Sequence, residues 1–185
     1  MLALWLSCGS ASAGIGYLVR LELASDVAVT DFAAYGRAVV VPFAEQASRH
    51  ASWHDRKERR EAARKAAQTF PRRLMLALRT TQVFHEVKDV PRPGEAALLV
   101  TGVLRRHERG SADARMHFGS GKAGAVFEAT LQLSDGATGR VLGLLRIERE
   151  PSASGYNAAT PRSVEQLMEA AAADCANQIA GLVAA

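Results

Sequence analysis

Cysteine is scarce in this sequence, which has only Cys8 and Cys175 among its 185 residues. Two cysteines near opposite ends of the chain do not make a disulfide framework, and their spacing fits no zinc-binding motif. Long apolar runs are missing as well, since no stretch approaches the roughly 18 residues that indicate a membrane-spanning helix. The sequence also offers no complete catalytic constellation. We therefore expect a protein that is not an enzyme and that needs no cofactor or metal.

The rest of the composition is that of an ordinary folded domain. A length of 185 residues favours one domain, and a hydrophobic content of 48% is enough for a real core. The formal net charge is +4 and the isoelectric point is near 9.4, which is moderately basic. Such a charge permits contact with an anionic surface and also favours solubility, so it does not distinguish between these two roles.

Residues 1–14 resemble the end of an export signal, because a short apolar run is followed by small residues. A full signal also has a positively charged start and roughly 7–15 apolar residues. Both features are missing here, so we expect the natural start to lie upstream of Met1. Cys8 resembles the lipid-attachment cysteine of a bacterial lipobox, and cleavage after Ala13 also matches an ordinary signal site. The third alternative is a frayed apolar N-terminus on a cytosolic protein.

Hydrophobic periodicity predicts strands and helices in alternation. The predicted strands are residues 18–23 with 27–32 as their continuation, 38–43, 83–87, 98–104, 124–133 and a last strand that ends at Ile147. Helices are predicted for residues 53–80 and from Ser163 to near the C-terminus. This order indicates an α/β fold: a mixed, largely antiparallel sheet with two main helices packed on one face. We expect a leader at 1–14, an N-terminal extension at 15–36 and a single α/β domain at 37–184.

Side-chain spacing predicts which faces are buried. One face of the strand at 124–133 is apolar and the other is polar, which indicates a sheet with one wet side. The apolar face is Ala125, Phe127, Ala129, Leu131 and Leu133, and the polar face is Glu128, Thr130, Gln132 and Ser134. On the last strand, the residues predicted to face together are Val141, Gly143, Leu145 and Ile147.

The two predicted helices carry apolar stripes. The first stripe is Ala62, Ala66, Phe70, Leu74 and Leu78, and the second is Val164, Leu167, Met168, Ala171, Cys175, Ile179 and Leu182. Ser163 and Gln166 have the spacing of a capping box at the start of the second helix. Pro71 removes a helical hydrogen bond to Ala67, so we expect the first helix to kink or break near Thr69.

The connection at residues 105–124 concentrates positive charge and glycine. The candidate anion-binding or partner-binding residues there are Arg105, Arg106, Arg109, Arg115 and Lys122. The sequence at 119–122 invites comparison with a phosphate loop, but such a loop opens a helix and this stretch opens a strand. Two interpretations stay open, a weak anion-binding surface and a solvated hairpin end.

Other residues with reactive, metal-binding or basic side chains are interpreted without a functional role. His50 and His54 are four residues apart, but two ligands do not make a metal site. His85 on a short strand is interpreted as structural, and Cys175 on an apolar stripe as a small buried hydrophobe. The basic run at 56–65 is interleaved with acidic residues and holds no aromatic residue for base stacking. We interpret that run as a solvated helix face and expect no nucleic-acid partner.

Several short motifs occur in an order that resembles a known protein family. They are Val39-Val40-Val41-Pro42-Phe43, Val83-Phe84 with Val87, Leu99-Val100-Thr101-Gly102, Gly119-Ser120-Gly121, and Leu133 with Asp135, Thr138 and Gly139. With these motifs, residues 27–184 resemble a bacterial family of exported lipoproteins of unknown function. More distantly the chain is similar to the N-terminal domain of TolB, to the curli-secretion lipoprotein CsgG and to penicillin-binding-protein activator lipoproteins, whose α/β domains begin with the same strand-Pro-Phe element.

The resemblance implies a location and a class of function. It implies the periplasm or outer membrane of a Gram-negative bacterium, with a lipid anchor if Cys8 is modified. It implies a non-enzymatic module that binds protein partners or assists envelope assembly, with an unknown envelope protein as partner. The alternative is a binder of small ligands or anions, or an enzyme, that uses the basic loop at 105–124. The oligomeric state cannot be deduced from the sequence.

Overall fold

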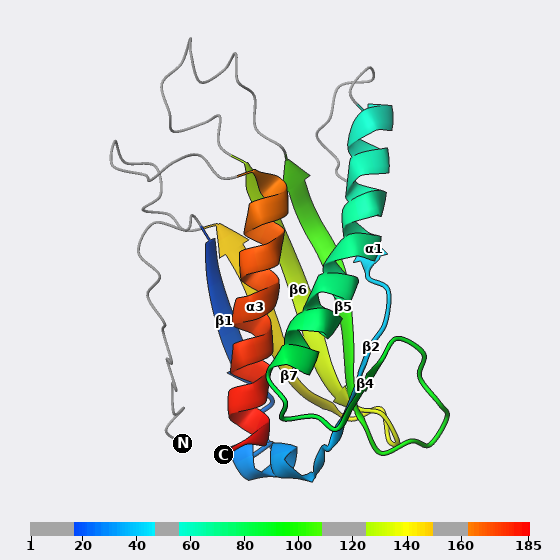
Figure 1. Cartoon of the computed structure of the whole chain (residues 1–185), viewed down its shortest axis with the longest axis vertical. Helices are drawn as coiled ribbons and strands as arrows, with labels where there is room; N and C mark the ends of the chain where they lie inside the picture. Colours follow the sequence, from blue (N-terminus) through cyan, green and yellow to red (C-terminus); the bar gives the residue numbers. More distant parts are fainter. Residues whose placement is uncertain (1–16, 47–55, 109–124, 150–162) are drawn as a thin grey trace.

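The computed structural model describes residues 17–46, 56–108, 125–149 and 163–185 (Figure 1). A seven-stranded sheet forms its centre. The strands are β1 (Tyr17–Leu23), β2 (Arg37–Val40), β3 (Ala44–Glu45), β4 (Glu86–Lys88), β5 (Leu98–Glu108), β6 (Val126–Asp135) and β7 (Val141–Arg149). The strand order is β1-β7-β6-β5-β2-β4, and β3 pairs with β5.

The strand directions confirm the mixed, largely antiparallel sheet that the sequence predicts. β1 pairs antiparallel with β7, β7 with β6, and β6 with β5. β2 runs parallel to both β4 and β5, and β3 runs parallel to β5. The chain therefore combines an antiparallel meander with a small parallel unit that is reached through a helical crossover.

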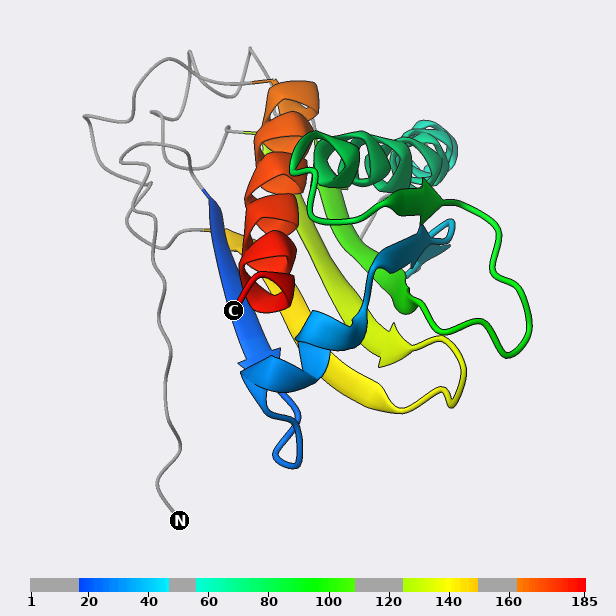
Figure 2. The same ribbon diagram turned by 60° about the horizontal axis from the view of Figure 1, so that its bottom comes forward.

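Two long helices, α1 (Arg56–Thr80) and α3 (Val164–Val183), lie on the same face of the sheet (Figures 1 and 2). The capping box that begins α3 is confirmed, because the Ser163 Oγ accepts a hydrogen bond from the Gln166 backbone N–H, while the Gln166 side chain accepts one from the Ser163 N–H. All seven residues of the predicted α3 stripe are buried. Four of the five residues of the α1 stripe are buried, and Ala62 is half-buried.

Of the predicted kink or break near Thr69, the break is wrong, because α1 continues through Pro71 as one helix. Proline leaves the carbonyl of Ala67 without its helical donor. That carbonyl instead accepts the backbone N–H of Phe43 at 3.2 Å. The connection between β2 and β3 thus supplies the missing hydrogen bond, and Figure 1 shows α1 bending without interruption.

Three aromatic side chains join the helix layer to the sheet. The ring centroids of Phe43 and Phe70 are 5.6 Å apart, and those of Phe70 and Phe127 are 4.8 Å apart. Phe43 also lies over Gly102, where a Cβ atom would fall 2.4 Å from the ring. The strand-Pro-Phe element of the sequence therefore anchors α1 on β5.

Four sequence predictions are corrected in detail. The predicted continuation of the first strand at 27–32 is instead the 3₁₀ helix η1 (Val29–Ala34). The strand predicted at 83–87 is shorter and shifted, since β4 is Glu86–Lys88. A register shift where Ser134 pairs with Val141 moves Val141 to the exposed side, and Leu142 is buried in its place. Ser134 is also buried, although the alternation places it on the wet side.

Candidate functional site: the open face of the sheet

The sheet face opposite α1 and α3, here called the open face, carries rows of polar side chains. Register places Arg20 of β1 directly opposite Arg146 of β7, and Arg146 directly opposite Thr130 of β6. Thr130 in turn lies opposite Val103 of β5. Because side chains alternate along a strand and these residues lie between more deeply buried neighbours, this row points away from the helices. We call Arg20, Arg146 and the nearby Arg105 the arginine row.

A bulge in β5 places two successive arginines on the open face. The pairing of β5 with β6 skips Arg105, since Leu104 lies opposite Ala129 and Arg106 lies opposite Glu128. The Arg105 Nε donates a hydrogen bond of 2.8 Å to the Thr130 hydroxyl, which fixes its side chain beside the row. Bulges are a common way to redirect a side chain at a functional surface.

The charges of these arginines are balanced unequally. Arg106 donates two hydrogen bonds of 2.9 Å to Glu108, and its Nη1 is 3.9 Å from Glu128. The Glu108 hydrogen bond raises the pKa of the Arg106 guanidinium above its usual value. Arg146 Nε is 3.3 Å from the Glu22 carboxylate.

Arg20 and Arg105 are different, because neither makes an ion pair with a carboxylate among the described residues. Arg20 instead lies directly across from another arginine, an arrangement that destabilises a sheet pair. Two guanidinium groups of the open face therefore lack a close carboxylate in the described part of the chain, although Glu22, Glu128 and Glu148 lie on the same face. Such exposed guanidinium groups bind carboxylates or phosphates well because of their planar pairs of donors.

Apolar side chains flank the arginine row. Leu18 and Val103 are each 37% exposed. Leu18 lies two residues before Arg20 on β1, and Val103 lies opposite Thr130, which is itself opposite Arg146. A surface that mixes arginine with exposed aliphatic groups suits a protein partner better than a lone ion.

The structure describes two of the six residues that the sequence singles out. Arg105 and Arg106 lie on the open face as described above. The others lie outside the described residues: Cys8, Arg109, Arg115 and Lys122. His50 and His54 also lie outside them. Whether the loop at 105–124 gathers its charge into one surface therefore stays a prediction.

Sequence reasoning missed Arg20 and Arg146. Each alternates with apolar residues on a predicted strand, which is a usable signal for an outward-facing position. Nothing local indicates that the first and last strands pair and bring the two arginines together.

His85 and Cys175 have structural surroundings. The Arg37 Nε donates a hydrogen bond of 3.1 Å to the His85 Nε2, and the His85 ring packs against Gly36. Cys175 is fully buried, and this burial raises the pKa of its thiol. The interpretation of Cys175 as a small buried hydrophobe is confirmed.

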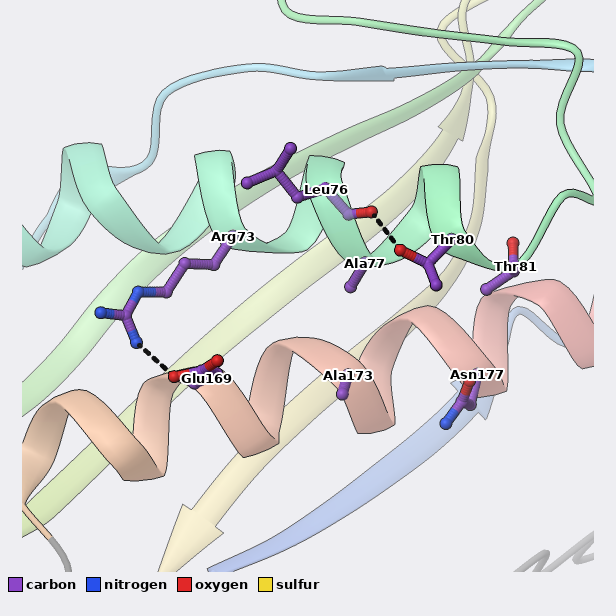
Figure 3. Close-up of a pocket in the computed structure, with 8 residues that line it drawn as sticks. All are labelled: Arg73, Leu76, Ala77, Thr80, Thr81, Glu169, Ala173 and Asn177. Atoms are coloured by element: carbon purple, nitrogen blue, oxygen red, sulfur yellow. Dashed lines mark hydrogen bonds and ion pairs between the residues drawn. The ribbon is translucent and has the colours of Figure 1, made fainter.

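A hollow lies between α1 and α3, on the side away from the sheet (Figure 3). This groove of about 540 Å³ is lined by Arg73, Leu76, Ala77, Thr80, Thr81, Glu169, Ala173 and Asn177. Its charged groups are Arg73 and Glu169, which face each other at 3.7 Å. The Thr80 hydroxyl donates a hydrogen bond of 3.0 Å to the Leu76 carbonyl. Few polar groups of the groove are therefore available to bind a ligand.

Within the ranges that the structure describes, no three His, Cys, Asp or Glu side chains are grouped closely enough to hold a metal ion. No helix in those ranges combines the length and hydropathy required to cross a membrane.

Comparison with known proteins finds similar solved structures, and two of them are described below. No family model matches the sequence, and no curated protein does. The PelC dodecamer from Paraburkholderia phytofirmans is similar with a TM-score of 0.48 and 14% identity, over 85% of this chain and 94% of that one. A single-substitution variant of the same PelC has a TM-score of 0.45 and 15% identity, over 83% and 95%. These likenesses are weak and assign no activity.

Proposed function

We propose that this chain is a non-enzymatic binding module of the Gram-negative envelope, and that its open face binds an acidic protein surface. The envelope location is supported by the export-signal character of residues 1–14 and by the lipoprotein-like order of motifs. The binding role is supported by the open face. The observation that carries it is the arginine row, in which Arg20 and Arg105 have no carboxylate partner among the described residues.

The energetics of the row favour an acidic partner. Opposed like charges cost stability in the isolated sheet, and a carboxylate placed between Arg20 and Arg146 would remove that cost. Neighbouring strands are about 4.8 Å apart, so acidic side chains on an extended or helical segment match the spacing. Leu18 and Val103 add apolar contact beside the charges. Charge complementarity of this kind sets the partner choice and the association rate.

The alternative function is binding of a small anion. Its support is the pair Arg105 and Arg106, at the start of the basic loop. Glu108 and Glu128 already compensate Arg106, which weakens that support. The enzyme alternative draws no support from the groove of Figure 3, because Arg73 and Glu169 pair with each other there.

The proposal is tested with a fluorescent poly-glutamate peptide as the probe, by fluorescence anisotropy. The test variant is Arg20→Gln/Arg105→Gln, and the matched control is Arg64→Gln/Arg72→Gln, which removes the same charge from exposed positions of α1. Each exposed pair contributes roughly 0.2–1 kcal/mol, so the test variant should bind about two- to thirtyfold more weakly. Wild-type binding should weaken with salt, because screening acts over about 10 Å at 0.1 M.

Two results would contradict the proposal. The first is equal weakening by the test and control variants, which would indicate attraction to overall charge alone. The second is a test variant that leaves peptide binding intact but loses binding to anionic phosphatidylglycerol vesicles, which would assign the open face to a lipid surface.

A further inference from the structure

The two edges of the sheet are protected very differently. β4 has three residues, of which Glu86 and Lys88 are charged, so that edge is short and polar. β1 has seven residues in continuous register with β7, and neither a bulge nor a proline interrupts it. Exposed edges of that length invite pairing with another strand, and proteins usually block them. Of the two edges, β1 is therefore the one that can pair with a further strand.

Register shows which backbone groups of β1 face outward. The Ala24 N–H donates to the Leu142 carbonyl at 3.0 Å, so Glu22 and Arg20, two and four residues earlier, also exchange hydrogen bonds with β7. The intervening residues, Val19 and Leu21, therefore point their N–H and C=O groups away from β7. A side-chain contact supports this outward orientation of the Val19 carbonyl, since the Gln178 Nε2 donates to that oxygen at 3.2 Å. A carbonyl has two lone pairs, so that oxygen can accept a second hydrogen bond.

We propose that two copies of this chain pair antiparallel along β1, about a two-fold axis at Leu21. Each Leu21 then exchanges backbone hydrogen bonds with the partner's Leu21, and Val19 lies opposite the partner's Leu23. All three side chains are half-buried on the helix side of the protomer, so their remaining apolar surface meets across the new strand pair. The sheets of the two copies become one continuous sheet.

Charge complementarity selects a second copy as the occupant. With the axis at Leu21, Arg20 lies directly opposite the partner's Glu22, and Glu22 lies opposite the partner's Arg20. Two reciprocal ion pairs form on the open face, where Arg20 of the single protomer lies across from Arg146. A strand that carries one positive and one negative residue on either side of its centre is self-complementary in this antiparallel arrangement.

The pairing shares Arg20 with the proposed acidic-partner site, because Arg20 would pair with the partner's Glu22 in the dimer. It places the Arg105 side chains of both copies, which keep no carboxylate partner among the described residues, on one surface and so doubles the number of these sites available to an acidic partner. A monomer that binds poly-glutamate would support the acidic-partner site and contradict the dimer. A dimer that does not bind poly-glutamate would do the reverse.

The test measures the mass of the full chain by sedimentation velocity over a wide range of concentrations, with thermal unfolding of each variant alongside. Arg20→Glu should raise the dimer dissociation constant roughly tenfold, because two attractive pairs become repulsive. The same change should raise the melting temperature of the protomer, since the introduced carboxylate would face Arg146. Glu22→Arg should also weaken the dimer, and the double exchange should restore it.

A second pair of variants tests the backbone hydrogen bonds. Leu21→Pro removes an outward N–H, which an edge strand tolerates, together with the leucine side chain, and should abolish the dimer while the fold persists. Leu21→Ala keeps that N–H and should remain dimeric. A wild-type chain that stays monomeric at high concentration overturns the proposal. An oligomer that survives both Leu21→Pro and Arg20→Glu overturns it as well.

Discussion

Substitution of Gly102 by alanine tests the packing that anchors α1 to the sheet. A Cβ atom at this position would lie 2.4, 2.6 and 2.6 Å from three atoms of the Phe43 ring, where ordinary contacts exceed 3.4 Å. The ring cannot move away easily, because Phe43 is 7% exposed and packs edge-on against Phe70. We therefore expect overpacking to exceed the usual gain from replacing a strand glycine.

The magnitude follows from two opposing contributions. Overpacking a core costs about 1–3 kcal/mol. Alanine in place of glycine in a strand returns about 0.5–1 kcal/mol of conformational entropy. The expected net loss for Gly102→Ala is therefore about 0–2.5 kcal/mol in the free energy of unfolding, measured by urea denaturation.

Two further variants sharpen the result. Phe43→Leu shortens the side chain over Gly102, so the double variant should lose at least ~0.5 kcal/mol less than the sum of the single losses. Gly181→Ala is the control, because nothing lies within 4 Å of its added Cβ, and it should stabilise α3 by up to about 1 kcal/mol. A Gly102→Ala protein that is more stable than wild type would refute the packing argument.

Three other outcomes are expected. Leu167→Ala in the buried stripe of α3 should cost roughly 2–5 kcal/mol in denaturant unfolding, and a loss below ~0.5 kcal/mol would contradict its burial. Hydrogen bonds from Tyr35 and Thr138 lower the pKa of Asp135 from its ordinary value of 3.8. The stabilising contribution of Asp135 is therefore present above that unfolded pKa and is lost as pH falls through the lower folded value. Tyr35→Phe should flatten the loss of melting temperature on acidification, and an unchanged pH profile would argue against this pair. Cys8→Ser in the full-length precursor should move the protein from the membrane to the soluble envelope fraction, and unchanged fractionation would remove the lipid-anchor hypothesis.

Local patterns predict α3 and the helix side of β6 in detail. The α3 stripe and its capping box depend only on neighbours within one or two turns, and both are confirmed. The apolar set of β6 from Phe127 to Leu133 is buried as its alternation predicts. Such features are readable because period and capping are properties of a single segment.

The failures come from contacts between segments that are distant in sequence. Pro71 would break an isolated helix, but the Phe43 N–H occupies the carbonyl that it frees. Val141 faces outward because of the register shift between β6 and β7, which no single-strand pattern reveals. Arg20 and Arg146 meet only because β1 joins β7, so the main part of the candidate site is visible only in the fold.

The pairing of β1 with β7 also constrains the order of folding. β1 is the first strand of the described sheet, and its only neighbour there is the last strand. β6 and β7 are joined by a tight turn at Asp135, so their ladder forms early from local contacts. β1 can be added only when nearly the whole chain has been made, because its partner strand is the last to be synthesised, and closing so long a loop adds an entropic cost. In a polypeptide that is delivered N-terminus first, the segment that arrives earliest is therefore ordered last, and the edge of β7 stays open until then.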